Sequence, residues 1–145
     1  MASVFNPETF LNTTFDESFS TARIPVPEGE YTAVIKEIKP RTAKERAVLD
    51  VIYGIDDPHV AEVTGFESPQ VRQSIFLDLT PTGGLAIGEG KNIGLGKLRE
   101  ACGQNQKGKA WQPGLLVGQV VKVKVAHRTY EDEVQADVKA VTALD

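Results

Sequence analysis

The fold is decided by the C-terminal stretch from Val117 to Leu144, which reads VGQVVKVKVAHRTYEDEVQADVKAVTAL. Between Val120 and His127 apolar and basic residues alternate almost strictly. This pattern predicts a strand with one face on a core and the other in water. A turn at residues 130–133 and a second alternating run from 134 to 140 follow. The stretch therefore predicts a β-hairpin with one apolar face.

The other face of this hairpin is cationic. Its basic side chains are Lys122, Lys124, Arg128 and Lys139, and an aromatic residue, Tyr130, stands near the tip. Cationic strands beside an aromatic suit a single-stranded nucleic acid, because the charges follow the phosphates and the ring offers a surface on which a base can stack. The hairpin therefore predicts a contact with nucleic acid.

The chain has 145 residues and a formal net charge of −4. This length suits one compact domain with a hydrophobic core. A protein that neutralises duplex phosphates over a broad surface is usually basic, so the net charge counts against non-specific duplex binding. A local basic groove remains compatible with it, because binding depends on where the charges lie.

Cys102 is the single cysteine, which excludes an internal disulfide and a metal site built from several cysteines. Of a reactive nucleophile and a small buried residue in a short helix, the second interpretation is favoured. No apolar run approaches the roughly 20 residues that span a bilayer. The N-terminal residues lack the basic and apolar regions of a signal peptide. We therefore expect an intracellular protein with no membrane partner.

Residues 1–28 predict an N-terminal arm, with phenylalanines at positions 5, 10, 15 and 19. Pro25 and Pro27 exclude a regular helix or a central strand at its end. The arm is expected to pack its phenylalanines on the domain or on a neighbouring subunit. A short amphipathic helix over 7–11 is the alternative.

Further strands are expected at 29–38, 48–55 and 71–80, and a helix at 95–101 follows the glycine-rich segment 81–96. The second strand places Leu49, Val51, Tyr53 and Ile55 on one face. In the first strand the inward face stays open, because the apolar residues Tyr31, Ala33 and Ile35 compete with Val34 and Ile38.

Residues 29–145 thus predict a mainly β domain: a five-stranded antiparallel barrel with one short helix between strands three and four. That order is the order of an OB-fold, which binds its ligands on the face of strands two and three and in the loops that join strands one to two and four to five. The first of these loops, residues 39–46, carries four cations, which are Lys39, Arg41, Lys44 and Arg46. A solvated charged loop is the competing interpretation.

Two aromatic residues outside the hairpin are further candidates. Phe76 shares the outward face of the third strand with Arg72, which makes it a platform for a base, unless the arm covers and buries it. Trp111 lies in a polar loop, where it either stacks a base or closes the end of the barrel, and closing the end is favoured.

The sequence gives little support for catalysis. Asp50 and Asp78 could form a magnesium-dependent nuclease site with Asp56 and Asp57, but no lysine or histidine base is positioned beside them. The glycine-rich segment lacks the Gly-Lys-Ser/Thr ending of a phosphate-binding loop. We therefore expect no enzyme, no cofactor and no metal.

Four segments carry a family resemblance: SVFNPETFLNTTF, PEGEYTAVI, NIGLGKLREACG and VGQVVKVKVAHRTYEDEVQADVKAV. They resemble a group of small phage proteins described as single-stranded DNA-binding proteins with an OB-fold. The resemblance spans most of the chain. It is clearest in the last 30 residues, where a lysine-rich strand, His-Arg-x-Tyr and a strand ending Asp-Val-Lys follow one another.

The resemblance implies an accessory protein of phage replication or recombination that coats exposed single strands in the cytoplasm of the infected cell. Many such proteins end in an acidic tail that contacts replication proteins, whereas this chain ends VTALD. The resemblance therefore leaves recruitment of replication proteins through the C-terminus open, and the arm is expected to mediate self-association.

The sequence thus predicts binding of single-stranded DNA with little sequence preference. The side chains expected to hold phosphates are Lys36, Arg41, Lys44, Arg46, Arg72, Lys122, Lys124 and Arg128. Those expected to stack bases are Tyr130 and Phe76, followed by Trp111. The alternative is a non-catalytic structural or interaction protein, such as a phage particle component or an OB-like adaptor.

Overall fold

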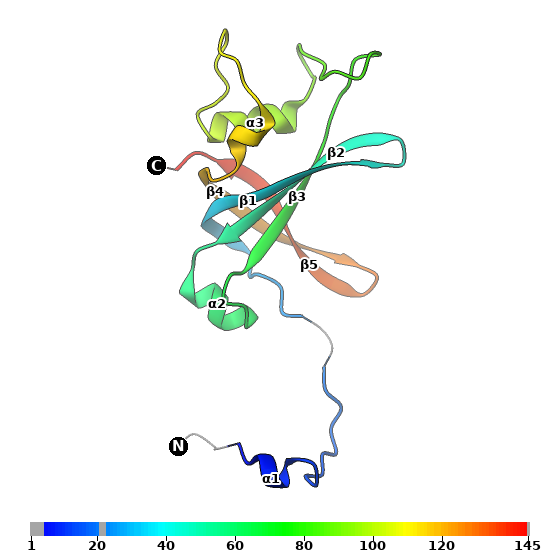
Figure 1. Ribbon diagram of the computed structural model, residues 1–145, viewed down its shortest axis with the longest axis vertical. Coiled ribbons are helices and arrows are strands. Elements are labelled where there is room, and N and C mark those ends of the chain that lie inside the picture. The colour runs from blue at the N-terminus through cyan, green and yellow to red at the C-terminus, as the bar shows by residue number, and fades with distance from the viewer. Residues whose placement is uncertain (1–4, 21–22, 145) are drawn as a thin grey trace.

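The computed structural model describes residues 5–20 and 23–144. Five strands form a closed ring in the order β1-β2-β3-β5-β4 (Figure 1). Their bounds are β1 Gly29–Ala43, β2 Arg46–Ile55, β3 Gln70–Phe76, β4 Val120–Tyr130 and β5 Glu133–Thr142. The helices are α1 Pro7–Phe10, α2 Pro58–Thr64, α3 Ile93–Ala101 and the 3₁₀ turn η1 Pro113–Leu116. The mainly β class, the five strands and a helix between β3 and β4 are confirmed.

The prediction of an entirely antiparallel sheet is wrong. Four neighbouring pairs are antiparallel, but β3 runs parallel to β5, which it meets at the residue pair Arg72 and Asp137. The reason is topological: strand directions cannot alternate all the way round a closed ring with an odd number of members. Any closed ring of five strands must therefore contain a parallel pair.

A β-bulge in β1 resolves the ambiguity in the inward face of that strand. Ala33 and Ile35 are buried, and the pairing with β2 then shifts between Ile35 and Glu37, so that Lys36 is the extra residue. Beyond the bulge Ile38 packs against the core. A bulge shifts the alternation by one residue, so Ala33 and Ile35 face inward before Lys36 and Ile38 faces inward after it, while Val34 lies on the outward side.

The expectation of a loop at 39–46 is wrong. Residues 39–43 continue β1, and only Lys44 and Glu45 turn the chain, both with positive φ of 47° and 66°. Two residues with positive φ match the right-handed twist of the strands that they join. The hairpin of β4 and β5 turns in the same way at Glu131 and Asp132, where the sequence predicts a turn.

Helix α2 lies in a segment that the sequence analysis treats as a connection. The side chain of Asp57 caps it by accepting from the backbone N–H groups of His59 (2.9 Å) and Val60 (3.4 Å). Pro58 starts the helix, and Gly65 ends it in the left-handed conformation. These are ordinary helix boundary signals, so the helix was predictable. Strand β3 is shorter than expected, because it ends at Phe76.

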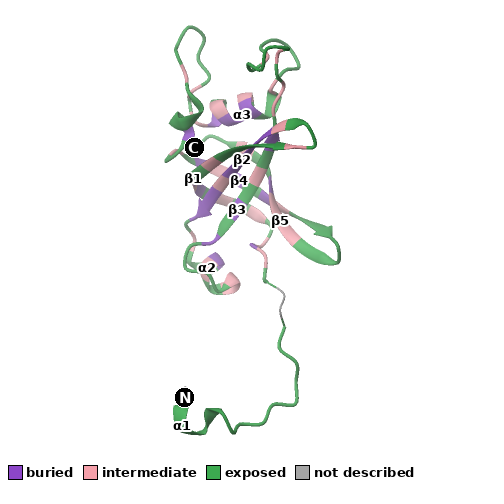
Figure 2. Cartoon of the chain, turned by 45° about the vertical axis from the view of Figure 1, so that its right-hand side comes forward, coloured by how far each residue is buried: buried purple, intermediate pink, exposed green. Residues whose placement is uncertain are grey.

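The core fills the inside of the ring, and α3 lies at one end of the ring, where it contacts β3 and β5 (Figure 2). The inward face of β2 is buried as predicted, and so are Val121, Val123 and Val125 of β4. Leu95, Leu98 and Ala101 are the residues of α3 that are buried. Cys102, next to them, is half-buried at the end of the helix, and burial raises the pKa of its thiol.

The arm extends away from the ring of strands, and residues 5–20 are exposed throughout (Figures 1 and 2). Its phenylalanines form two edge-to-face pairs, Phe5 with Phe10 and Phe15 with Phe19. The short helix that was the alternative is present as α1. Residues 1–4 and 21–22 of the predicted arm lie outside the described residues. Packing of residues 5–20 on the domain is therefore not observed.

The base of the arm is fixed to the ring. Val26 is buried, its carbonyl lies 2.7 Å from Nε2 of His127, and the side chain of Glu28 accepts from the backbone N–H of His127 at 2.9 Å. No helix within residues 5–20 and 23–144 is long and apolar enough to cross a membrane.

Candidate nucleic-acid interface

Two hairpins frame one side of the ring. The ends of the β1–β2 hairpin and of the β4–β5 hairpin project on the same side, and the outer surface of β3 lies between them (Figure 1). We call the outward side of β1, β2 and β3 in this frame the framed face. Several of the predicted contact residues belong to it.

The strand register fixes which side chains are neighbours on the framed face. One row across the strands consists of Arg41, Val48 and Phe76, and the next row consists of Lys39, Asp50 and Ser74. Residues directly opposite on neighbouring strands point to the same side of a sheet. The register therefore brings two basic side chains, an acid and an aromatic ring together.

The ring of Phe76 forms a cation–π contact with the guanidinium of Arg46. The guanidinium carbon of Arg46 lies 4.6 Å from the ring centroid, and the residue is 54% exposed. The alternative in which Phe76 is buried under the arm is therefore wrong for the described chain. Phe76 and Arg46 thus form an accessible aromatic–cationic pair at the end of the β1–β2 hairpin.

Asp50 is the one buried charged side chain among the described residues. Nε of Arg41 donates to its Oδ2 at 2.5 Å, Nη2 of Arg41 reaches Oδ1 at 3.4 Å, and Oγ of Ser74 donates to Oδ1 at 2.7 Å. The hydrogen bond from Arg41 holds the pKa of the Asp50 carboxyl below its usual range, although burial acts in the opposite direction. The three side chains form a preorganised polar network.

The second half of the site spans β3, β5 and β4. Arg72 pairs across the strands with Asp137, and Asp137 forms an ion pair with Nε of Arg128. Nη2 of Arg128 also donates to Oε1 of Gln135 at 3.2 Å. Tyr130 is exposed at the end of the hairpin. Arg72, Arg128 and Tyr130 thus extend the framed face toward the second hairpin.

This second hairpin has an acidic tip, which is formed by Glu131, Asp132 and Glu133. The first hairpin is the more cationic one, since Lys44 in its turn lies between Arg41 and Arg46 along the chain. A polyanion would therefore be attracted to the first hairpin more strongly than to the tip of the second.

Lys36 lies in the bulge of β1, and its side chain crosses Gly54 of β2. A Cβ atom added at Gly54 would stand 2.7 Å from Cε of Lys36. Gly54 therefore gives the lysine stem room to lie flat on the sheet. Lys36 is exposed near the framed face. It lies farther from the β1–β2 turn than the row of Lys39 and Asp50.

Lys122 and Lys124 lie elsewhere on the ring. They face outward on β4 as predicted, but their neighbours are Thr32 and Glu30 of β1, and β4 is adjacent to neither β2 nor β3. Arg128 and Tyr130 share this outward side of β4 farther along the strand. The structure therefore does not bring Lys122 and Lys124 together with Arg46 and Phe76.

Trp111 closes part of the end of the ring near α3. Its indole Nε1 donates to Oε1 of Gln104 at 2.8 Å, the guanidinium carbon of Arg99 lies 4.2 Å from its ring, and the ring packs against the core. These contacts fit the closing role that the sequence favours over the stacking of a base.

The acid pair considered for a nuclease is not an open site. Asp50 is held by Arg41 and Ser74, while Asp78 exchanges hydrogen bonds with Asn92: its carboxylate accepts from the Asn92 backbone N–H, and its own N–H donates to the Asn92 side chain, both at 2.8 Å. Within the described ranges, no group of three or more His, Cys, Asp or Glu residues could hold a metal ion.

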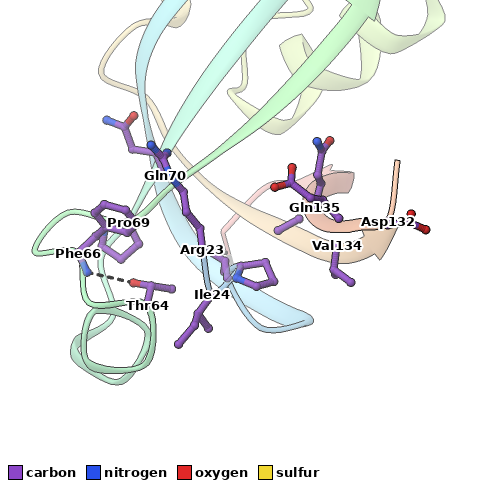
Figure 3. Close-up of a pocket in the computed structure, with 13 residues that line it drawn as sticks. Arg23, Ile24, Thr64, Phe66, Pro69, Gln70, Asp132, Val134 and Gln135 are labelled. Atoms are coloured by element: carbon purple, nitrogen blue, oxygen red, sulfur yellow. Dashed lines mark hydrogen bonds between the residues drawn. The ribbon is translucent and has the colours of Figure 1, made fainter. Parts of the chain in front are cut away.

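A cavity of about 770 Å³ lies beside the base of the arm. Figure 3 shows Phe66 and Val134 on opposite sides of it, with Ile24 between them. The walls come from three places: the base of the arm, the segment from α2 into β3, and the start of β5. No sequence pattern predicts this cavity, because only the folded chain brings the three segments together.

The hydrogen-bond network of Asp50 was not predicted either. Alternation in the third strand places Ser74 outward between Arg72 and Phe76, and a two-residue turn at 44–45 would have set Arg41 diagonally opposite Asp50. That turn carries neither glycine nor asparagine, the residues that usually mark it. Comparison of the chain with known protein families and with curated protein sequences gave no match.

Proposed function

We propose that the ring is an OB-fold and that this chain binds single-stranded DNA with little sequence preference and without catalysis. The observation that carries the proposal is the exposed ring of Phe76 with the Arg46 guanidinium over it. The pair lies at the end of the β1–β2 hairpin, which projects on the same side of the ring as the β4–β5 hairpin (Figure 1). An OB-fold binds its ligands on this side, between the loops that join strands one to two and four to five.

A single strand suits this face better than a duplex. Bases of a single strand can unstack and lie on an aromatic ring, whereas those of a duplex are enclosed in the helix. The net charge of −4 also disfavours broad electrostatic attachment to a duplex. Because every base has a π-face, stacking on Phe76 and Tyr130 would tolerate any sequence.

The phosphates would follow the basic side chains of the framed face. Arg41, Lys44 and Arg46 would hold the strand at the first hairpin, and Arg72 and Arg128 would guide it toward Tyr130. Lys36 would contact it at the edge of this path. Lys122 and Lys124 would add a second contact along β4, reached only by a longer strand.

The setting that fits such a protein is phage DNA replication or recombination in the cytoplasm of the infected cell. Its partners there would be single-stranded DNA, other copies of the chain through the arm, and replication proteins. Support for self-association comes from the four phenylalanines of the arm, which are exposed in the described chain. Exposed apolar clusters commonly mark protein contacts.

The test is a titration with a fluorescent oligo-dT of about 30 nucleotides, a length that exceeds the 4–16 nucleotides an OB-fold covers. It is run at low and at moderate salt, with a duplex of the same length beside it. Tight, salt-sensitive binding to the single strand alone is expected. No binding at low salt would overturn the proposal.

A structural or interaction protein is the second candidate, and the same exposed arm favours it. Here the phenylalanines and the outer faces would contact proteins, and DNA would be irrelevant. Sedimentation with and without oligo-dT separates the two functions. A defined oligomer whose size and stability ignore DNA would favour the structural role.

A further inference from the structure

Asp50 poses a problem for a face that binds phosphates. Its carboxylate stands in the row of Lys39 and Ser74, next to the row of Arg41 and Phe76. Judged by charge alone, a carboxylate here repels the phosphates of a nucleic acid. If charge were the only effect, removal of the Asp50 carboxylate would tighten the binding of nucleic acid.

The geometry of the Arg41–Asp50 pair suggests the opposite effect. Asp50 engages the Nε and Nη2 edge of the guanidinium. A guanidinium has five N–H donors, so the donors on Nη1 and the second one on Nη2 remain for another acceptor. The Asp50 side chain is 8% exposed and that of Arg41 is 45% exposed. The carboxylate thus lies behind the guanidinium, which faces solvent.

Asp50 is itself held in place from the neighbouring strand. Ser74 lies directly opposite on β3 and donates to Oδ1 at 2.7 Å. Arg72, on the same strand, adds a favourable electrostatic interaction. The orientation of Arg41 is therefore set by a chain of contacts that crosses from β3 through β2 to β1.

We propose that Asp50 is a positioning residue: it holds Arg41 so that the outward N–H groups of the guanidinium receive a phosphate beside the Phe76 platform. The inference rests on the proposed function. Immobilising a long side chain on binding costs affinity, and an arginine that is already ordered avoids most of that loss. The loss without Asp50 corresponds to about 3- to 10-fold in affinity.

The test is a double-mutant cycle on the full chain, with oligo-dT of about 30 nucleotides as the probe, longer than one OB-fold covers. Asp50→Asn is measured in the wild-type background and together with Arg41→Ala. In the wild type, Asp50→Asn should weaken binding by about 3- to 10-fold although it removes a negative charge. In the Arg41→Ala background it should leave binding unchanged or tighten it, because only repulsion remains to be removed.

The salt dependence supplies a readout that a merely structural role would not move. Loss of one ordered phosphate contact should flatten the slope of log K against log salt by about 0.7 for a single strand. Glu37→Gln is the matched control. It also removes a carboxylate from the sheet, but the Glu37 side chain is exposed on β1 and pairs with Lys39. It should leave the affinity unchanged or raise it slightly.

Ser74→Ala keeps the test valid should Asp50→Asn or Arg41→Ala unfold the protein. It leaves every charge in place and removes one hydrogen bond to Asp50, so charge alone predicts no change and positioning predicts a modest loss of affinity. Tighter binding of Asp50→Asn in both backgrounds, or wild-type affinity of Ser74→Ala, would overturn the inference. Absence of binding by the wild type would instead overturn the proposed function, and the inference with it.

Discussion

The guanidinium of Arg46 covers the ring of Phe76 at a distance of 4.6 Å from its centroid. A cation–π contact at an exposed site is worth about 0.5–1 kcal/mol, whereas base stacking on an aromatic is worth about 1–3 kcal/mol. A base can therefore replace the guanidinium on the ring. Arg46 would then remain beside the bound strand, where it can meet a phosphate.

Phe76→Ala should weaken binding of oligo-dT by about 1–3 kcal/mol, the value of one stacked base. Its effect on stability should be small, because the ring is 54% exposed. Phe66→Ala is the matched control, since Phe66 is 48% exposed and also carries an arginine, Arg23, at 6.0 Å. Fluorescence anisotropy measures both variants. Equal losses for both would argue against a specific role of Phe76.

Lys122 and Lys124 should contribute only when the DNA is long enough to reach them. With oligo-dT of about 30 nucleotides, replacing both by alanine should flatten the salt slope by about one to two units. With about 8 nucleotides, which one OB-fold covers, the same variant should bind like the wild type. Lys44→Ala with Arg46→Ala should flatten the slope at both lengths. Loss of binding to the short oligonucleotide in the Lys122/Lys124 variant would instead place those lysines at the main site.

Tyr53→Phe should destabilise the fold without changing DNA binding. Tyr53 is buried, its hydroxyl donates to Oε1 of Gln73 at 2.7 Å, and burial raises the pKa of this phenol well above its usual value. Loss of the bond should lower the free energy of unfolding by about 1 kcal/mol. Urea titration gives that value. A Tyr53→Phe variant as stable as the wild type would mean that this hydrogen bond adds nothing net.

Stability should fall at acid pH partly through Asp50. The folded-state pKa of this carboxyl lies below its unfolded value, so its contribution is present above the unfolded pKa of about 3.9 and is lost as the pH drops through the folded pKa. Asp50→Asn should therefore flatten the stability profile below about pH 4. Thermal unfolding between neutral and acid pH tests this. A parallel profile for the variant would assign the acid sensitivity to other carboxylates.

Removal of residues 1–20 should abolish self-association and leave the ring intact. Of these, residues 5–20 are exposed and do not belong to the core, whereas Val26 and Glu28, which anchor the chain to the ring, stay in place. Sedimentation velocity should show a smaller species with unchanged thermal unfolding. An oligomer that persists after truncation would locate the contact on the ring.

The alternation of apolar and polar residues was the sequence pattern that predicted the structure best. It located both strands of the C-terminal hairpin and the inward faces of β2 and β4, because a side-chain period of two is imposed by the strand itself. It failed in β1, where the bulge at Lys36 moves the period by one residue. It also failed at 39–43, where Pro40 breaks the pattern and the turn lacks glycine.

The candidate site was predictable residue by residue but not as an arrangement. Charge in the predicted loop pointed to Arg41 and Arg46, and alternation in the third strand pointed to Arg72 and Phe76. Their grouping, and the separation of Lys122 and Lys124 from them, depends on strand order around the ring, which local patterns do not encode. The network of Asp50 depends on contacts across three strands and could not be found from spacing along the chain.

The seam between β3 and β5 has a consequence for how the molecule folds. Each hairpin joins segments that are close in the sequence, whereas Arg72 and Asp137 meet only after most of the chain is in place. Closing so long a loop is entropically unfavourable, and contacts between distant segments slow folding. We expect this seam to open before the other junction between distant segments, because one residue pair joins β3 to β5 whereas six pairs join β1 to β4. Hydrogen exchange at residues 70–76 would reveal this opening. A ligand that touches both Arg72 and Arg128 would hold the seam shut, so closure of the seam and capture of the ligand would be thermodynamically linked.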